Sequence, residues 1–355
     1  MPSAYPRRRE VAIGPVVIGG DNPVTIQSMT NTQTTDVSAT VAQIGRMAAL
    51  GCDLARVSVP DEQSAEALRA IKQEIGIPLI ADIHFNPELA LAAIDAGVDK
   101  VRLNPGNIST RERIAPVAKE LARKRIPVRV GVNAASISHD LKQLHREDPV
   151  KAIVESAHRY VEILRGFGVH DVVVALKSSD VLNTIECYRR FATESDLPLH
   201  IGITEAGPGL TGAARSAVGI GILLAEGLGD TVRASLSGDV EDEIIVCREI
   251  LASLGLREAP RLVACPTCAR AEFDVAAMAD EIRPRVMALS KPVSVAIMGC
   301  VVNGPGEAEH ADLGIISVSG KFMVYRSGRV ITKGLGQAAA LSALLSELEA
   351  LEAEP

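Results

Sequence analysis

The stretch Ile77–Asn107, IPLIADIHFNPELALAAIDAGVDKVRLNPGN, holds one complete strand–helix–strand unit. Pro78–Ile83 and Val98–Leu103 are apolar runs of strand length, and Pro87–Ala96 between them has helical periodicity. Gly97 follows the helix directly, as glycine commonly does at a helix end. A helix that links two such strands predicts that the strands are parallel neighbours in one sheet.

The same unit recurs through the first two-thirds of the chain. Eight units over roughly 250 residues are the size and rhythm of an α/β fold of the TIM (β/α)8 barrel type. A doubly wound open sheet is the alternative, but it needs fewer strands and usually has a glycine-rich fingerprint after the first one, which this chain lacks. The eight predicted strands are Val24–Ser28, Cys52–Val57, Pro78–Ile83, Val98–Leu103, Pro127–Val132, Asp171–Leu176, Pro198–Ile203 and Thr231–Leu236.

The pattern changes after Leu256, where Arg257–Arg261 has the composition of a short linker. We therefore expect the barrel to occupy residues 1–256 and a small α+β domain to occupy residues 257–355. In the second domain we predict a helix near Asp274–Met287, strands at Val293–Met298, Gly314–Val318 and Phe322–Tyr325, and a final helix from about Leu335 to Leu351.

Composition excludes several classes of protein. The 355 residues carry a net charge of −7, which argues against a general nucleic-acid-binding surface. No uninterrupted apolar run reaches the length of a membrane span, so we expect no membrane association. Glycines and prolines interrupt the region after the arginine-rich first ten residues, so we expect no signal peptide. Cysteines without an export signal are typical of a reducing, cytoplasmic location.

Polar and charged residues follow the predicted barrel strands. Because the carboxyl ends of barrel strands meet at one mouth, these side chains should converge where barrel enzymes have their active sites. Converging cations repel one another unless an anion lies among them, and guanidinium groups fit phosphate oxygens. The pattern therefore predicts a site for a small, highly charged phosphate ester. The strand-end residues are Arg56, Asp82 with His84, Arg102, Arg129 with Asn133, Lys177, Glu205, and Arg233 with Ser235.

Pairing of each arginine with a neighbouring carboxylate is the structural alternative, but Asp82 and Glu205 are the main acids near the strand ends. Glu205 is a candidate proton donor or acceptor beside the phosphate site. His84 is either a second such group or a structural histidine.

Three cysteines in the second domain have the spacing of metal or cluster ligands. Cys265 and Cys268 form a C-x-x-C pair, and Cys300 follows an apolar run. Zinc could take these thiolates with His310, although a second C-x-x-C pair is absent. An iron–sulfur cluster usually takes four thiolates, so Glu307, seven residues after Cys300, is a candidate fourth and exchangeable ligand.

The other three cysteines, Cys52, Cys187 and Cys247, lie in apolar patterns and are predicted to be buried packing residues.

Six motifs together resemble the IspG/GcpE family of 4-hydroxy-3-methylbut-2-en-1-yl diphosphate synthases, in its two-domain bacterial form. The resemblance spans nearly the whole chain, and no large inserted domain separates the barrel from the cysteines. The motifs are QSMTN at 27–31, DIHF at 82–85, RLNPGN at 102–107, SLSG at 235–238, CPTCAR at 265–270 and MGCVVNGPGE at 298–307.

The resemblance implies two-electron reduction of 2-C-methyl-D-erythritol 2,4-cyclodiphosphate, with ring opening and loss of water, in the non-mevalonate isoprenoid pathway. It implies flavodoxin or ferredoxin as electron donor and a homodimer in which one subunit's cluster domain caps the other's barrel. It also places Glu205 near the reacting carbons. It implies a [4Fe–4S] cluster on Cys265, Cys268, Cys300 and Glu307, and a diphosphate among Arg56, Arg102, Arg129, Lys177, Arg233 and Ser235, with Asn133 nearby.

Two other functions stay open from the residues alone. A zinc-stabilised barrel lyase or aldolase could act on a phosphate ester through a Schiff base on Lys177. A non-enzymatic cluster sensor is the second, although it would not need the cationic barrel mouth.

Overall fold

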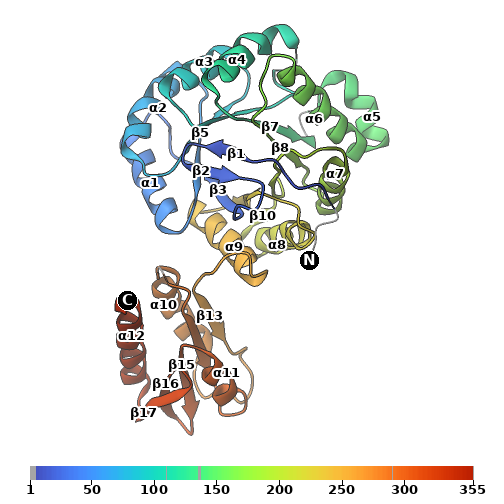
Figure 1. The fold of residues 1–355 in the computed structure, drawn as a ribbon. Coiled ribbons are helices and arrows are strands. Elements are labelled where there is room, and N and C mark those ends of the chain that lie inside the picture. Colours follow the sequence, from blue (N-terminus) through green and yellow to red (C-terminus); the bar gives the residue numbers. More distant parts are fainter. Residues whose placement is uncertain (1–4, 109, 135–136, 290, 355) are drawn as a thin grey trace. The chain divides into compact units, whose positions relative to one another are not determined.

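The computed structural model describes residues 5–108, 110–134, 137–289 and 291–354 (Figure 1). The chain divides into two compact units, Met1–Arg257 and Glu258–Pro355. The first unit is an eight-stranded parallel barrel with helices outside it, which confirms the predicted fold class.

The barrel strands follow one another around the ring in chain order. Parallel pairing runs continuously from β8 through β3 to β11 and β9, and a parallel bridge between Val174 and Leu199 joins the two ends of the sheet. All eight predicted strands are present; several are shorter than predicted, and the last two keep only two residues each. The strands are β3 (Thr25–Met29), β4 (Leu54–Ser58), β5 (Leu79–Ile83), β6 (Lys100–Leu103), β7 (Val128–Asn133), β8 (Val172–Lys177), β9 (His200–Ile201) and β11 (Thr231–Val232).

Helices cover the outside of the barrel (Figure 1). Several begin at a capping side chain that accepts a hydrogen bond from a first-turn backbone N–H, for example Asp61 before α2 and Asn86 before α3. These caps fix where each strand-end loop turns into its helix. The helices are α1 (Val37–Ala49), α2 (Glu62–Glu74), α3 (Pro87–Ala96), α4 (Arg111–Lys124), the 3-10 turn η2 (His139–Leu141), α5 (Lys142–Glu147), α6 (Pro149–Arg165), α7 (Val181–Glu194), α8 (Gly209–Ala225) and α9 (Val240–Ser253).

A hairpin of β1 (Val11–Ile13) and β2 (Val16–Ile18) covers the N-terminal end of the barrel. Its buried side chains pack on Leu54, Ile80 and Val173, which lie near the starts of their strands. The sequence analysis did not predict this hairpin, because three-residue strands give little periodic signal. The hairpin closes the N-terminal end of the barrel. The polar residues at the strand ends lie at the opposite, open end.

A short parallel pair extends the barrel wall beyond its carboxyl ends, between β10 (Gly207–Pro208) and β12 (Leu236–Ser237).

The second unit is a five-stranded mixed sheet with helices on both faces, as predicted for an α+β domain. One face packs on α10 and α12 and the other on α11. Strand order follows the chain, with β13, β14 and β15 parallel and the last two pairs antiparallel. The elements are β13 (Arg261–Ala264), α10 (Val275–Met287), β14 (Ser294–Met298), α11 (Gly304–His310), β15 (Leu313–Val318), β16 (Lys321–Arg326), β17 (Arg329–Leu335) and α12 (Gln337–Ala353).

Three details of this unit differ from the prediction. Arg261 begins β13 and does not end a linker, and β17 was not predicted. Helix α11 was not predicted either, and it accommodates Pro305 in its first turn. In the described part of the chain, no helix combines the length and apolarity that a membrane span requires.

Candidate active site

A cavity of about 300 Å³ opens at the carboxyl ends of the barrel strands. Nine of the ten strand-end residues that the sequence predicts for this site line it, all except Glu205, from six different strands or strand ends. Five further residues complete the wall. The lining consists of Met29, Arg56, Asp82, His84, Arg102, Arg129, Gly131, Val132, Asn133, Ala175, Lys177, Thr204, Arg233 and Ser235.

Asp82 is the buried centre of the charge network at one side of the cavity. Its Oδ1 accepts a hydrogen bond from Arg102 Nη1 at 3.1 Å, and Arg56 Nε lies 3.7 Å from its Oδ2. Burial alone would raise the pKa of Asp82, but the two guanidinium groups outweigh burial and hold the pKa at about 2. Asp82 therefore stays ionised and fixes the positions of both arginines.

His84 lies against the same network. Its Nε2 is 3.2 Å from Arg102 Nη1 and 4.0 Å from Asp82 Oδ2. Burial lowers the pKa of His84, and the nearby guanidinium groups add to this against the attraction of Asp82. A neutral imidazole at this place accepts a hydrogen bond from Arg102 and supports its orientation.

Glu243 on α9 holds Arg233 in a bidentate ion pair. Both nitrogen–oxygen distances, Nε to Oε2 and Nη2 to Oε1, are 3.0 Å. Ser28 Oγ and the backbone N–H of Leu236 also donate to Glu243, which is 4% exposed. The sequence analysis did not find this carboxylate. The available signal was its place on the buried stripe of α9, where a charged residue interrupts apolar neighbours.

Arg129 and Lys177 have less compensation than the other cations of the cavity. Arg129 is 2% exposed, and its Nε and Nη1 have no hydrogen-bond partner among the described residues. Burial lowers the pKa of Arg129 well below its usual value, and the neighbouring guanidinium groups of Arg56 and Arg102 add to the effect. Burial, with Arg129 and Arg233 beside it, likewise lowers the pKa of Lys177. An anion in the cavity would favour the charged form of both side chains.

Two glycines make room for these cations. A Cβ at Gly131 would lie 2.8 Å from Arg102 Nε, and one at Gly202 would lie 2.8 Å from Lys177 Nζ and closer still to a backbone carbonyl. Any larger residue would push the charged groups away from the barrel wall. The glycines therefore belong to the site although they carry no functional group.

The rim of the cavity carries the remaining candidates. Asn133 Nδ2 donates to Thr204 Oγ1 at 3.5 Å. Glu205 follows Thr204 and is exposed, but it does not line the cavity. Its backbone φ is +52°. A left-handed conformation is uncommon for a residue other than glycine, and such residues are frequent at functional sites. Glu205 thus stands at the rim beside the cavity.

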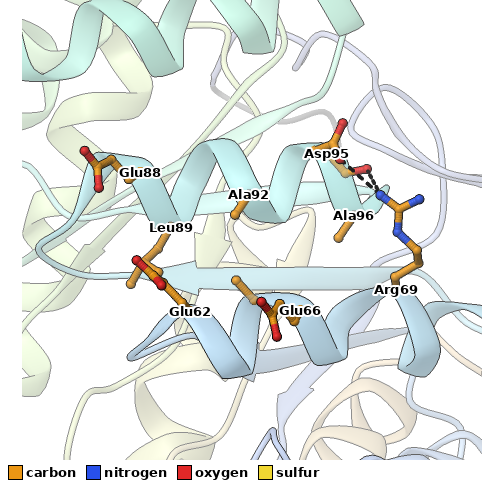
Figure 2. Close-up of a pocket in the computed structure, with 9 residues that line it drawn as sticks. Glu62, Glu66, Arg69, Glu88, Leu89, Ala92, Asp95 and Ala96 are labelled. Atoms are coloured by element: carbon orange, nitrogen blue, oxygen red, sulfur yellow. Dashed lines mark hydrogen bonds and ion pairs between the residues drawn. The ribbon is translucent and has the colours of Figure 1, made fainter.

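A larger groove of about 440 Å³ lies outside the barrel, between α2 and α3 (Figure 2). Figure 2 shows carboxylates from both helices around it and Arg69, whose Nη2 donates to Asp95 Oδ2 at 3.0 Å. Glu62, Glu66 and Glu88 supply the other negative charges. An anionic ligand would be repelled there, so charge, and not size, selects the barrel mouth as the candidate site.

The cysteine loops of the second unit leave the same end of its sheet. Cys265 directly follows β13, and its N–H donates to Ile297 O on the parallel strand β14 at 2.9 Å. The N–H of Glu272 donates to Gly299 O at 3.0 Å, so the two loops are joined again beside Cys300. Cys268 is exposed between these bonds, and Glu307 lies on α11.

The thiols are not gathered around a metal centre. Among the described residues, no three His, Cys, Asp or Glu side chains are close enough to hold a metal ion. The donor set nevertheless suits an iron–sulfur cluster, since three free cysteines follow neighbouring parallel strands. By contrast, Cys52, Cys187 and Cys247 are buried as predicted, and burial raises the pKa of each thiol to about 12.

Comparison with known proteins identifies both units. The model of the GcpE TIM-barrel domain matches residues 8–248, and that of the GcpE protein C-terminal domain matches residues 261–350. A Geobacillus kaustophilus protein named 4-hydroxy-3-methylbut-2-en-1-yl diphosphate synthase (flavodoxin) is 47% identical over 92% of this chain and 88% of its own length. A Geobacter sulfurreducens protein of the same name is 46% identical over 98% of this chain and 99% of its own length.

Solved structures resemble the barrel unit. Dihydropteroate synthase of Yersinia pestis aligns with a TM-score of 0.50 at 12% identity, over 69% of this chain and 98% of that chain. A truncated 3-deoxy-D-arabino-heptulosonate 7-phosphate synthase of Thermotoga maritima aligns with a TM-score of 0.50 at 13% identity, over 70% of this chain and 94% of that chain. At these identities the likeness shows the barrel fold and nothing about the reaction.

Replacement of Asp82 by Asn should destabilise the protein at pH 7 by roughly 3–5 kcal/mol, because it leaves Arg56 and Arg102 buried without their counter-charge. The pKa of Asp82 is depressed, so its contribution is present above the ordinary carboxyl value and is lost as pH falls through about 2. Urea unfolding of both proteins from pH 7 to pH 2 measures this. A stability difference that is absent at pH 7, or that grows toward pH 2, would contradict the assigned role.

Proposed function

This chain belongs to the GcpE family, and we propose that it acts as a 4-hydroxy-3-methylbut-2-en-1-yl diphosphate synthase that reduces 2-C-methyl-D-erythritol 2,4-cyclodiphosphate with electrons from flavodoxin. The observation that carries this proposal is the cavity at the barrel mouth, where five cationic side chains meet. The lyase alternative has no comparable support, since both units match domains of the GcpE family, and the relatives are named 4-hydroxy-3-methylbut-2-en-1-yl diphosphate synthase (flavodoxin).

The cavity residues bind and orient the two phosphates. Arg129 and Lys177 supply cationic donors, and each charge-assisted hydrogen bond to phosphate contributes about 1.5–3 kcal/mol. Asp82 and Glu243 hold the remaining arginines in place before the substrate arrives. Binding therefore needs little ordering of side chains, which favours affinity.

We assign the [4Fe–4S] cluster to Cys265, Cys268 and Cys300, with Glu307 as the fourth ligand. The support is the donor set itself, on loops joined by backbone hydrogen bonds at one end of a parallel sheet. Such a cluster supplies single electrons to the bound substrate. Free thiols of this kind persist in a reducing compartment, so we place the enzyme in the cytoplasm.

The chain's own residues manage charge and protons during the reaction. Reduction by two electrons opens the ring and frees one phosphate oxygen as an anion, and one proton is consumed as the oxygen of a hydroxyl group leaves as water. Glu205 at the rim is the group we assign to proton transfer to that oxygen. Arg129 and Lys177 keep the released diphosphate in the cavity, because its charge increases when the ring opens.

We further propose a homodimer in which the cluster domain of one subunit serves the barrel of the other. The support is the family resemblance, together with the separation of the phosphate-binding and cysteine-bearing residues into two compact units. Each catalytic centre would then take residues from both subunits.

The cluster assignment predicts that Cys300→Ser loses most of its bound iron and its activity, because the soft thiolate ligand is removed. Anaerobic iron and sulfide analysis, with the absorbance near 400 nm, measures this. The matched control is Cys187→Ala, which removes a buried barrel thiol and should keep its iron content. Normal iron and activity in Cys300→Ser would refute the assignment.

The dimer proposal predicts that two inactive variants, Glu205→Ala and Cys265→Ser, restore activity when they form mixed dimers. One centre in each mixed dimer then carries both defects and the other carries neither, which gives about half of the wild-type dimer's activity. Centres built inside single subunits would each keep one defect. Absence of activity in a preparation shown to contain mixed dimers would therefore reject the cross-subunit arrangement and leave the chemistry untouched.

A further inference from the structure

A second polar layer lies in the barrel below the cavity. Side chains two residues apart on a strand face the same side of the sheet. Met29, Arg102 and Arg233 line the cavity, so Gln27, Lys100 and Thr231, which precede them by two residues, face the barrel lumen. By the same rule His200 faces the lumen, since a Cβ at position 202 would touch Lys177, which lines the cavity.

Three side chains of this layer are fully buried and carry polar atoms without partners. Gln27, Lys100 and His200 are each 0% exposed. Lys100 Nζ, both amide atoms of Gln27 and His200 Nε2 have no hydrogen-bond partner among the described residues, nor do Nε and Nη1 of Arg129 directly above. Buried polar groups in native proteins are normally hydrogen-bonded, so three such side chains in one layer, with Arg129 above them, indicate an occupant.

Donors dominate this set. Lysine and arginine offer only donors, and His200 Nδ1 lies 3.4 Å from Thr231 Oγ1, which leaves Nε2 as the group directed elsewhere. Gln27 Oε1 is an unpartnered acceptor, and His200 Nε2 is a donor in the tautomer in which Nδ1 accepts from the Thr231 hydroxyl. Water brings as many donors as acceptors and leaves the surplus unchanged, whereas an anion accepts without donating.

The charge balance leads to the same ligand. Six cations, the five of the cavity and Lys100, face two carboxylates, Asp82 and Glu243, among the described residues. A cyclic diphosphate with one ionised oxygen on each phosphate would leave two positive charges uncompensated; this step alone rests on the proposed function. Burial, followed by repulsion from Arg129, lowers the pKa of Lys100, and an anion beside it would favour its charged form.

We propose that the barrel lumen beneath the substrate cavity binds a small monovalent anion of the halide class. Lys100 Nζ is the central ligand, with Arg129, Gln27 Nε2 and His200 Nε2 as the surrounding donors. The anion neutralises Lys100 and fixes the lower side of Arg129, so that its other donors stay directed at the substrate.

Bromide identifies the ligand directly, because it scatters anomalously and water does not. Crystals of the full-length, unmodified protein grown in sodium bromide without substrate should show an anomalous peak within hydrogen-bonding distance of Lys100 Nζ. A lumen that holds only water, or a bromide peak confined to the cavity above, would overturn the proposal. Either result would leave the proposed function standing, since neither substrate nor cluster takes part in the measurement.

A solution test uses the melting temperature at constant ionic strength, with chloride replacing the bulky anion gluconate. Wild-type protein should gain about 2–4 °C in a saturable manner. Lys119→Met, which removes an exposed lysine of α4, should respond as wild type, and Lys100→Met should not respond. An equal response in Lys100→Met would contradict the site. If that variant does not fold, the anomalous bromide map of the unmodified protein alone decides whether the anion site exists.

Discussion

Repulsion among the cations at one end of the barrel is the constraint on which the rest of the structure depends. Two buried carboxylates offset part of this repulsion. Asp82 lies between Arg56 and Arg102, and Glu243 holds Arg233 through both oxygens. A buried carboxylate stays ionised only beside such cations, so each carboxylate and its arginines depend on one another. Arg129 remains without equivalent compensation, which makes the mouth a receptor for an anion before any ligand arrives.

The barrel turns this constraint into a defined cavity. Parallel strands bring residues that are distant in the sequence to one end, and hairpin β1–β2 seals the other end with Ile13 and Ile18. Gly131 and Gly202 have no side chain, so long cationic side chains can lie against the barrel wall at these positions. Charge also separates this cavity from the larger acidic groove outside the barrel, where a phosphate ester would find no complementary surface.

Much of this arrangement could be predicted from the sequence, because strand ends are marked by polar residues after apolar runs. Arg56 and Arg102 were identified in this way, and both line the cavity. Glu243 was missed because it lies on a helix and not at a strand end, and its only local signal was its place on the buried stripe of α9. The hairpin β1–β2 was missed because its strands are too short, and α11 because its Gly-Pro-Gly start has the composition of a loop.

A calorimetric titration of the cyclic diphosphate measures whether the cationic mouth binds this substrate. Arg129→Met should weaken binding by about 10- to 100-fold while iron content stays unchanged, because a charge-assisted phosphate contact is lost. Arg69→Met, in the outer groove, should bind as tightly as wild type. Equal affinity in wild type and Arg129→Met would contradict the account.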